Sequence, residues 1–201
     1  NKEVGIEFHD NGYAAGVTWF RNDYKNKIVA GDDVVGYASN GANILRWENG
    51  GKAIVEGLEG NLTIPVLRDV LEWRTNATYM FRSESKKTGN PLSVIPEFTI
   101  NSQLDWQLTD KLDTTLSWTQ YGRQKPRQNA EIRNEAGEMS NREISPYSIF
   151  GLNVNYDITK NLRANAGINN LFDKRVYREN DGASTYNEPG RAYYAGVTVS
   201  F

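Results

Sequence analysis

Cysteine is absent from the 201-residue sequence, and histidine occurs once, at His9. The absence of cysteine excludes disulfides and thiolate metal sites, and one histidine leaves no set of side chains suited to zinc or iron. Long apolar runs are also missing, because no stretch approaches the roughly 18 apolar residues that a membrane-spanning helix needs. We therefore predict neither a metal site nor a membrane-spanning helix.

Net charge and catalytic motifs are also scarce. The formal net charge is −2, whereas a nucleic-acid-binding domain is normally basic, so we expect no nucleic acid partner. The dinucleotide fingerprint GxGxxG, the P-loop, HExxH and GxSxG do not occur. Asp32 and Asp33 lie in an expected loop without a partner acid or base. We predict that the chain is not an enzyme and assign no catalytic residue.

Apolar and polar residues alternate with a period of two in several segments, which is the pattern of half-buried β-strands. The clearest case is the last segment, in which Tyr193, Val197 and Val199 alternate with small or polar residues. In the second segment, Phe20 falls on the polar side, so the face assignment is weakest there. The expected strands cover residues 4–8, 13–20, 58–64, 73–82, 98–106, 112–119, 150–156, 162–169 and 193–201.

One side of each expected strand carries no charge along its centre and has aromatic residues near its ends. Tyr and Trp favour the membrane interface, and Lys or Arg facing lipid at mid-bilayer would cost roughly 2–4 kcal/mol. A packed sandwich core would instead favour branched aliphatic residues. The pattern predicts an all-β fold, namely a transmembrane antiparallel β-barrel. The aromatic residues are Tyr13, Trp19, Trp73, Phe81, Trp106, Trp118, Tyr193 and Phe201.

The connections between these strands alternate in length. Outer-membrane barrels have short periplasmic turns and long extracellular loops, so we predict the bacterial outer membrane, extracellular long loops and a periplasmic C-terminus. An odd number of strands does not complete a bacterial barrel, so we expect further barrel residues before Asn1. Short turns are expected near residues 10–12, 66–70, 109–111 and 159–161, and long loops near 31–51, 83–96, 123–146 and 174–190.

Several strings, in order along the chain, resemble those of TonB-dependent receptors for ferric catecholate siderophores of the enterobactin type. NLFDKR at 170–175, YNEPGR at 186–191 and the terminal Phe201 are typical of TonB-dependent receptors. RNDYKNKI at 21–28, VEGLEG at 55–60 and EISPYSIFGL at 143–152 narrow the resemblance to the enterobactin group. The resemblance implies a plugged barrel of about 22 strands, with residues 1–201 as its C-terminal portion and the plug domain absent from this chain.

The resemblance also implies a function: an outer-membrane receptor and energy-dependent transporter for ferric siderophores, with ferric enterobactin or a related catecholate as the ligand. Expected partners are the siderophore, the receptor's own plug, outer-membrane lipid, lipopolysaccharide, and the TonB–ExbB–ExbD complex through the missing N-terminal part; colicins or phage are further candidates. Iron would arrive chelated, so no cofactor is expected. A passive porin or structural barrel without a plug, and a soluble β-sandwich binding module, remain alternatives.

A basic loop beside a tyrosine is the candidate ligand-binding site. A ferric tris-catecholate is anionic and aromatic, and Arg, Lys and aromatic side chains can bind it through charge, stacking and cation–π contacts. The alternative is a solvated loop whose charges pair with Glu131 and Glu135 or with lipopolysaccharide phosphates. The candidates are Tyr121, Arg123, Lys125 and Arg127, joined by Arg46, Trp47 and Arg82 from other extracellular segments.

Four charged residues lie on the polar side of the expected strands near the short turns. They are Arg74, Asp105, Asp113 and Arg163. In a plugged barrel they would contact the plug. Ion pairs within the wall, or contact with water, are the alternative.

The last segments carry motifs with assembly and structural roles. Leu171 and Phe172 of NLFDK are expected to pack in the wall, and Pro189 and Gly190 indicate a turn into the final strand. That strand resembles the signal read by the outer-membrane assembly machinery; the alternative is that an aromatic residue simply ends a lipid-facing strand. The signal residues are Tyr193, Val197, Val199 and Phe201.

Overall fold

The structure is a computed structural model that describes the chain except residues 87–88, 90, 93–94, 125–143 and 177–187 and the side chains at 27, 29–33, 45, 47–48 and 50. No helix in the described residues has the length and apolar character to cross a membrane. The strands are β1 (Lys2–Asp10), β2 (Tyr13–Tyr37), β3 (Asn43–Leu67), β4 (Leu71–Ser85), β5 (Phe98–Thr109), β6 (Leu112–Tyr121), β7 (Tyr147–Thr159), β8 (Leu162–Asn169) and β9 (Ala192–Val199).

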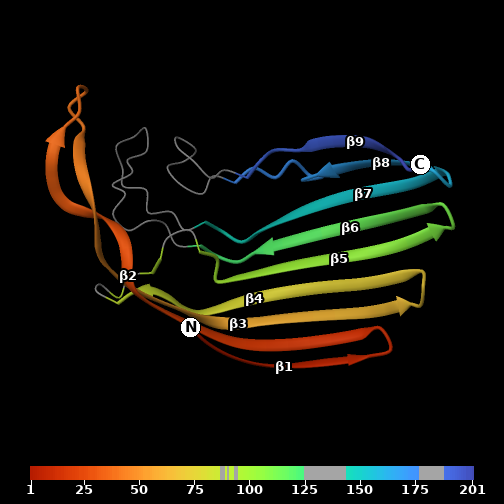
Figure 1. Cartoon of the computed structure of the whole chain (residues 1–201), viewed down its shortest axis with the longest axis horizontal. Coiled ribbons are helices and arrows are strands. Elements are labelled where there is room, and N and C mark those ends of the chain that lie inside the picture. The colour runs from red at the N-terminus through yellow and green to blue at the C-terminus, as the bar shows by residue number, and fades with distance from the viewer. Residues whose placement is uncertain (87–88, 90, 93–94, 125–143, 177–187) are drawn as a thin grey trace.

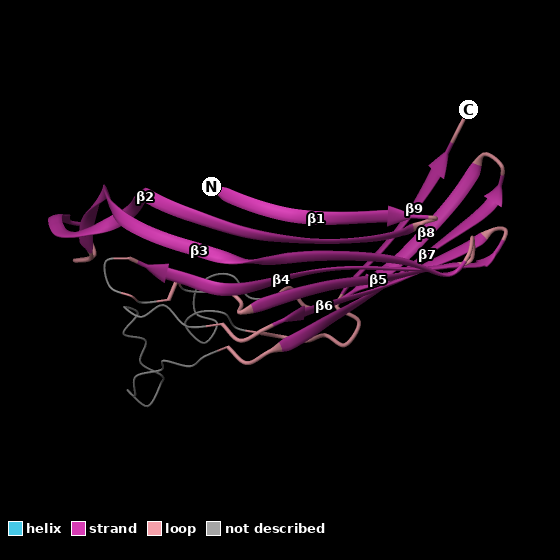
Figure 2. Cartoon of the chain, turned by 90° about the horizontal axis from the view of Figure 1, so that it is seen from below, coloured by secondary structure: helices cyan, strands magenta, loops and turns pink. Residues whose placement is uncertain are grey.

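These strands form one curved antiparallel sheet. Its nine strands lie in sequence order from β1 to β9, and each pairs with its neighbours along the chain (Figure 1 and Figure 2). β1 and β9 form the two edges of the sheet. This up-and-down order is what hairpin connections between successive strands produce. It confirms the predicted all-β antiparallel fold.

Four short connections gather at one end of the sheet, which we call the short-turn end; the opposite end is the long-loop end (Figure 1). The β1–β2 turn consists of Asn11 and Gly12, with φ of +48° and +87°. Positive φ at both central residues is the type I′ geometry that Asn-Gly favours in two-residue hairpins. All four predicted short turns occur between strands where expected.

Residues 31–51 were predicted as a loop, and this prediction is wrong. β2 and β3 are each 25 residues long and stay paired as far as Tyr37 and Asn43, so they form a hairpin that extends beyond the other strands (Figure 1). Register shifts, the first between Tyr24 and Lys27, interrupt the period-two pattern. Backbone pairing continues without alternation of side chains, so the hydrophobic pattern did not reveal these strands.

The register sorts side chains onto two faces, because direct cross-strand partners share a face. Leu104 lies opposite both Trp73 and Leu116. On the other side, Asn101 donates to Asn76 and accepts from Thr119, both at 3.1 Å. We call these sides the apolar face and the polar face. The apolar face includes Val4, Ile6, Phe8, Val17, Leu58, Leu62, Trp73, Ala77, Leu104, Trp106, Leu116, Trp118, Leu152, Val154, Ala166, Val197 and Val199.

The apolar face is open, with no second layer of described chain over it. Trp106 is 47% exposed, Leu116 42% and Val197 65%, although a soluble β-sandwich would seal these side chains. The buried hydrophobic residues of the described chain lie toward the long-loop end instead: Phe20, Ala53, Ile54, Ile144 and Tyr147. The soluble-sandwich alternative is therefore contradicted.

A β-bulge corrects the predicted face of Arg82. Met80 lies opposite Gly57 but Arg82 lies opposite Glu56, so Phe81 is an extra residue in β4. Such an insertion reverses the alternation beyond it, and Arg82 therefore lies on the apolar-face side, where it pairs with Glu84. The sequence pattern had placed Arg82 on the polar face.

Phe20 lies on the polar face, as the alternation indicated. It is 8% exposed, and its ring covers Gly57, where an added Cβ would come within 2.9 Å of the ring. A glycine at position 57 therefore makes room for an aromatic side chain on an otherwise polar face.

Candidate functional site

Two tyrosines meet on the polar face at the long-loop end. Tyr121 ends β6 and lies opposite Tyr147, the first residue of β7. Their ring centroids are 4.8 Å apart, with the planes tilted by 30°. Tyr147 is buried, and its hydroxyl donates to Glu188 Oε1 at 2.8 Å. The arrangement is an aromatic pair anchored to the segment that leads into β9.

Tyr147 was not among the predicted site residues. A signal was present, because strand alternation places Tyr147 and Ile149 on the same side as Gly151 and Asn153, opposite Phe150 and Leu152. An aromatic residue on the polar side, directly after a loop, is unexpected for a wall residue. Its partner Tyr121 lies in another strand, and a single-strand pattern does not show that contact.

Arg123 follows β6 and is exposed, and its carbonyl accepts a hydrogen bond from the Glu97 amide at 2.9 Å. Pairing continues beyond β6 at Gln124, which bridges Pro96 and Ile144. The alternation therefore places Arg123 on the polar face with Tyr121. Lys125 and Arg127, predicted for the same site, lie outside the described residues.

The remaining predicted ligand residues come from other places. Arg46 is exposed and Trp47 pairs with Ala30 through its backbone, both in the extended β2–β3 hairpin; the Trp47 side chain is not described. The bulge places Arg82 on the apolar-face side, opposite Glu56. Arg82 and Arg123 nevertheless both line an open hollow of about 330 Å³ beside the β4–β5 connection. Tyr121 and Arg123 share the polar face, whereas Arg82 meets Arg123 only at this hollow.

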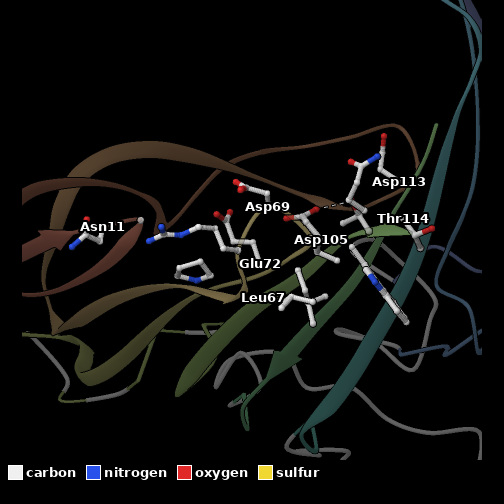
Figure 3. Close-up of a pocket in the computed structure, with 15 residues that line it drawn as sticks. Asn11, Leu67, Asp69, Glu72, Asp105, Asp113 and Thr114 are labelled. Atoms are coloured by element: carbon white, nitrogen blue, oxygen red, sulfur yellow. Dashed lines mark hydrogen bonds between the residues drawn. The ribbon is translucent and has the colours of Figure 1, made fainter. Parts of the chain in front are cut away.

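Near the short-turn end, the polar face carries a first ion-pair network. Arg74 pairs with Asp105 and approaches Glu72 Oε1 at 3.3 Å. Asp105 also accepts from Thr115 Oγ1 at 2.7 Å. Asp105, with Glu72, lines an open hollow of about 650 Å³ at this end of the sheet (Figure 3).

A second network repeats this arrangement on β6, β7 and β8. Arg163 pairs with Asp113 across the intervening strand and lies 3.6 Å from Asp157 Oδ1. Asn155 Nδ2 donates to Asp113 Oδ1 at 2.6 Å. All four residues predicted to contact the plug thus make ion pairs within the wall, which is the alternative that the sequence left open. Contact with a plug stays a prediction.

The NLFDKR and EPGR strings fold together at the long-loop end. Asn170 is buried, with φ of +52°, and its Nδ2 donates to the carbonyls of Lys174 and Pro189, both at 2.8 Å. Asp173 accepts from the Arg191 amide at 2.8 Å, and this hydrogen bond is the main reason that the pKa of Asp173 lies below its usual value. The two strings therefore form a clasp that joins the end of β8 to the start of β9.

The predicted assembly signal lies on the edge strand. Tyr193, Val197 and Val199 of β9 are exposed on the apolar face, and Phe201 follows the strand. This position leaves the side chains accessible to another protein or to lipid. Recognition by an assembly machinery stays a prediction.

The open apolar face, the charge-bearing polar face and the sorted connections define this chain as a segment of a membrane β-barrel wall. Residues 1–171 match the family described as TonB dependent receptor-like, beta-barrel, and the chain belongs to this family. The apolar face is accordingly the lipid-facing side, and the polar face lines the barrel lumen.

Similar proteins cover the whole chain. The chain is 55% identical to the ferric enterobactin receptor PirA of Pseudomonas aeruginosa and 46% identical to the ferrienterobactin receptor of Escherichia coli. It matches these over its entire length but spans 27% and 29% of theirs. A crystal structure of a mutant ferric enterobactin receptor from P. aeruginosa in complex with enterobactin superposes with a TM-score of 0.78 at 46% identity, over 99% of this chain and 31% of that one.

A second solved structure is the siderophore receptor PirA from Acinetobacter baumannii. It superposes with a TM-score of 0.79 at 44% identity, again over 99% of this chain and 31% of that chain. The nine-stranded sheet therefore corresponds to a part of these receptors rather than to the whole of one.

Proposed function

We propose that this chain is part of the barrel of an outer-membrane receptor that takes up ferric siderophores by an energy-dependent mechanism, with ferric enterobactin or a related catecholate as the ligand. The observation that carries the proposal is the similarity along the whole chain to relatives named ferric enterobactin receptors, at 55%, 48% and 46% identity. The enterobactin-bound structure at 46% identity adds support.

The polar face supplies chemistry that suits this ligand at the long-loop end. Ferric enterobactin would present an anionic, aromatic tris-catecholate. Arg123 offers a cation on the lumenal side, and Tyr121 offers an aromatic face held by the buried Tyr147. Guanidinium groups and aromatic faces bind such a ligand through charge, stacking and cation–π contacts. Lys125 and Arg127 would extend the same basic segment.

The orientation is part of the proposal. The short-turn end would face the periplasm, with the C-terminus there, and the long-loop end would be extracellular. The ion-pair networks of Arg74 and Arg163 would then face the plug near the periplasmic exit. TonB–ExbB–ExbD would act through a region outside this chain, and iron would pass through as chelated cargo rather than as a resident cofactor.

Binding of ferric enterobactin to the full-length receptor tests the ligand assignment. We expect the combined change Arg123→Gln, Lys125→Gln and Arg127→Gln to weaken binding by roughly tenfold to a hundredfold, because charged contacts at a ligand site contribute about 1.5–3 kcal/mol before screening. Quenching of intrinsic fluorescence during titration measures the affinity.

The matched control is Arg21→Gln, which removes the same charge toward the same end of the sheet but on the lipid-facing side. Its affinity should equal that of the wild type. Unchanged binding in the triple variant, or an equal loss in the control, would reject the assignment of the lumenal loop.

A passive porin or a plugless barrel is the second candidate, because the polar face could line a water-filled channel. Uptake of ⁵⁵Fe-labelled enterobactin by whole cells separates the two. Import that stops when the proton gradient is collapsed supports the energy-dependent receptor. Import that continues at the same rate supports the porin.

A further inference from the structure

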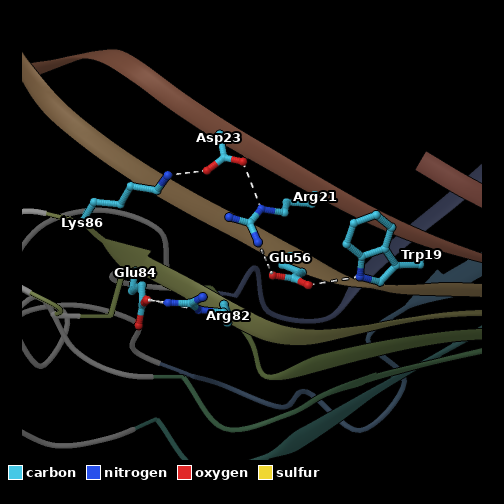
Figure 4. A network of polar contacts seen from close by, with 7 residues as sticks. All are labelled: Trp19, Arg21, Asp23, Glu56, Arg82, Glu84 and Lys86. Atoms are coloured by element: carbon cyan, nitrogen blue, oxygen red, sulfur yellow. Dashed lines mark hydrogen bonds and ion pairs between the residues drawn. The ribbon is translucent and has the colours of Figure 1, made fainter. Parts of the chain in front are cut away.

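A row of charged residues begins on the lipid-facing side just beyond Trp19, toward the long-loop end. The Trp19 indole donates to Glu56 Oε1 at 3.2 Å, and Glu56 Oε2 lies 3.5 Å from Arg21. Arg21 Nε donates to Asp23 at 3.0 Å, and Asp23 also pairs with Lys86. Figure 4 shows these side chains side by side, with the Arg82–Glu84 pair next to them.

The register puts this row on the outside of the barrel. Trp19 lies opposite Leu58 and Val4, which belong to the apolar face, and Arg21 lies opposite Glu56 and Lys2, two positions further along the same strands. Lys86, which follows β4, pairs with Asp23 of β2 across the intervening strand β3. At this point of β3, Ile54 lies opposite both Asp23 and Glu84. Ile54 is 1% exposed, so the charged side chains cover it.

Three lysines lie at the end of this row that is farthest from Trp19. An open hollow is lined by Asp23, Tyr24, Lys25, Asn26, Lys52 and Lys86. The Lys86 amide also donates to the Lys52 carbonyl at 2.8 Å, which holds the two strands in place. Hydrogen bonds from Arg21 and then Lys86 lower the pKa of Asp23, so this carboxylate stays ionised and orients both cations.

Taken together, the row is basic within a slightly acidic chain. It holds six cationic side chains and three carboxylates, a net charge of +3, whereas the whole chain has −2. We call this set the outer basic patch. Its members are Lys2, Arg21, Lys25, Lys52, Arg82 and Lys86, with Asp23, Glu56 and Glu84.

The patch begins in the layer of lipid headgroups and extends outward from it. A strand advances about 3.3 Å per residue, and barrel strands tilt by about 35–45°, so Arg21 lies roughly 5 Å, Asp23 roughly 10 Å and Lys25 roughly 15 Å above Trp19. Trp marks the membrane interface, and the headgroup region adds about 5–8 Å on each side of the hydrocarbon. Trp118 makes a similar contact, since its indole donates to Ser148 at 3.1 Å, two residues beyond its cross-strand partner Phe150.

We propose that the outer basic patch binds the phosphate groups of lipopolysaccharide in the outer leaflet. Lys and Arg recognise phosphate by charge and hydrogen bonding, while Asp23 and Glu56 hold the cations at the interface. The inference rests on the proposed orientation, with the long-loop end extracellular, and does not depend on which siderophore the receptor binds.

The test compares lipopolysaccharide bound per molecule of full-length receptor, by native mass spectrometry in detergent. We expect the variant Lys25→Gln, Lys52→Gln, Lys86→Gln to bind roughly a hundredfold more weakly, since basic residues near an anionic membrane surface each contribute about fivefold. The control variant Arg68→Gln, Lys111→Gln, Lys160→Gln removes three cations at the short turns and should bind as the wild type does. Dephosphorylated lipopolysaccharide should bind wild type and patch variant equally.

A measurement on the wild type keeps the test decisive if the patch variant does not fold. Acetylation of Lys25, Lys52 and Lys86 should be slower in phosphorylated than in dephosphorylated lipopolysaccharide, whereas Lys111 and Lys160 should react equally in both. Equal acetylation of the patch in the two lipids, or equal lipid binding by the two triple variants, overturns the proposal. Loss of ferric enterobactin affinity without loss of lipid binding also overturns it and assigns the patch to the siderophore.

Discussion

Leu116 and Ser117 are consecutive residues of β6, yet they lie in different surroundings. Leu116 lies opposite Leu104 and Leu152 on the lipid-facing side, and Ser117 lies opposite Gln103 and Gly151 on the lumenal side. In the described part of β1 and β2, the lipid-facing side carries charge only at the strand ends, at Asp10 and beyond Trp19, whereas the lumenal side of the sheet carries Arg74 and Arg163 within the strands, each paired with carboxylates. The difference teaches that the solvent on each side, and not strand geometry, selects the residue.

The largest effect should come from placing a charge in the lipid-facing row. Leu116→Arg should destabilise the folded barrel by roughly 2–4 kcal/mol, because an arginine at mid-bilayer has to be desolvated. Gln103→Arg, on the adjacent strand but facing the lumen, should cost clearly less. Urea titrations of the full-length receptor in lipid vesicles measure both. Equal losses would remove the distinction between the two sides.

Two glycines of β3 allow the lumenal and the lipid-facing sides to be compared by their steric tolerance of an added methyl group. Gly57→Ala, on the lumenal side, would bring a methyl group within 2.3 Å of the Tyr79 carbonyl oxygen and 2.9 Å of the Phe20 ring, and we expect a cost of roughly 1–3 kcal/mol. At Gly60, on the lipid-facing side, an added Cβ meets its nearest atom, the Gly16 carbonyl, at 3.6 Å, so Gly60→Ala should be close to neutral. Unfolding midpoints in urea distinguish the two, and a larger loss at Gly60 would contradict the packing described for Phe20.

The lumenal ion pairs should contribute little to stability by themselves. A double-mutant cycle with Arg74→Gln and Asp105→Asn should give a coupling free energy below about 1 kcal/mol, because half-exposed ion pairs are screened by solvent. A markedly larger coupling would show that the pair is shielded from water, as contact with a plug would make it. The cycle therefore distinguishes an ion pair within the wall from a pair that contacts a plug.

The smallest effect should appear as a pH dependence of the clasp. The pKa of Asp173 is lowered in the folded state, mainly by the Arg191 amide, so its stabilising contribution is present above the pKa of the unfolded chain and is lost as pH falls through the folded value. The free energy of unfolding can be measured between roughly pH 6 and pH 3, a range that brackets the unperturbed Asp pKa of about 3.9. As the pH falls, this free energy should decrease more steeply for the wild type than for Asp173→Asn. Identical slopes would contradict the role of this carboxylate.

Much of the fold could be predicted from alternation and turn chemistry. The period of two located strands such as β5 and β6. A short turn was predicted near residues 10–12, and the structure shows it as a type I′ turn at Asn11-Gly12. The long β2–β3 hairpin was missed because its residues do not alternate once they extend beyond the rest of the sheet. Strand pairing there depends on backbone hydrogen bonds, which leave no hydrophobic pattern in the sequence.

The candidate site could be predicted only in part. Tyr121 and Arg123 were recognised because a basic aromatic segment suits an anionic aromatic ligand, and both lie on the polar face. Tyr147 was missed because its contact with Tyr121 joins two strands across a long loop. Arg82 was assigned to the wrong face because one inserted residue, Phe81, reverses the alternation, and no local rule shows where a bulge occurs.

The sequence by itself determined which side of the regularly alternating segments meets hydrocarbon, because partitioning between lipid and water acts on every residue separately. Only the tertiary structure decided which side chains meet across strands. The Asp23–Lys86 pair joins residues 63 positions apart, and the Trp19–Glu56 bond joins residues 37 apart. Such contacts depend on register and bulges, which are set by the pairing of whole strands rather than by any one segment.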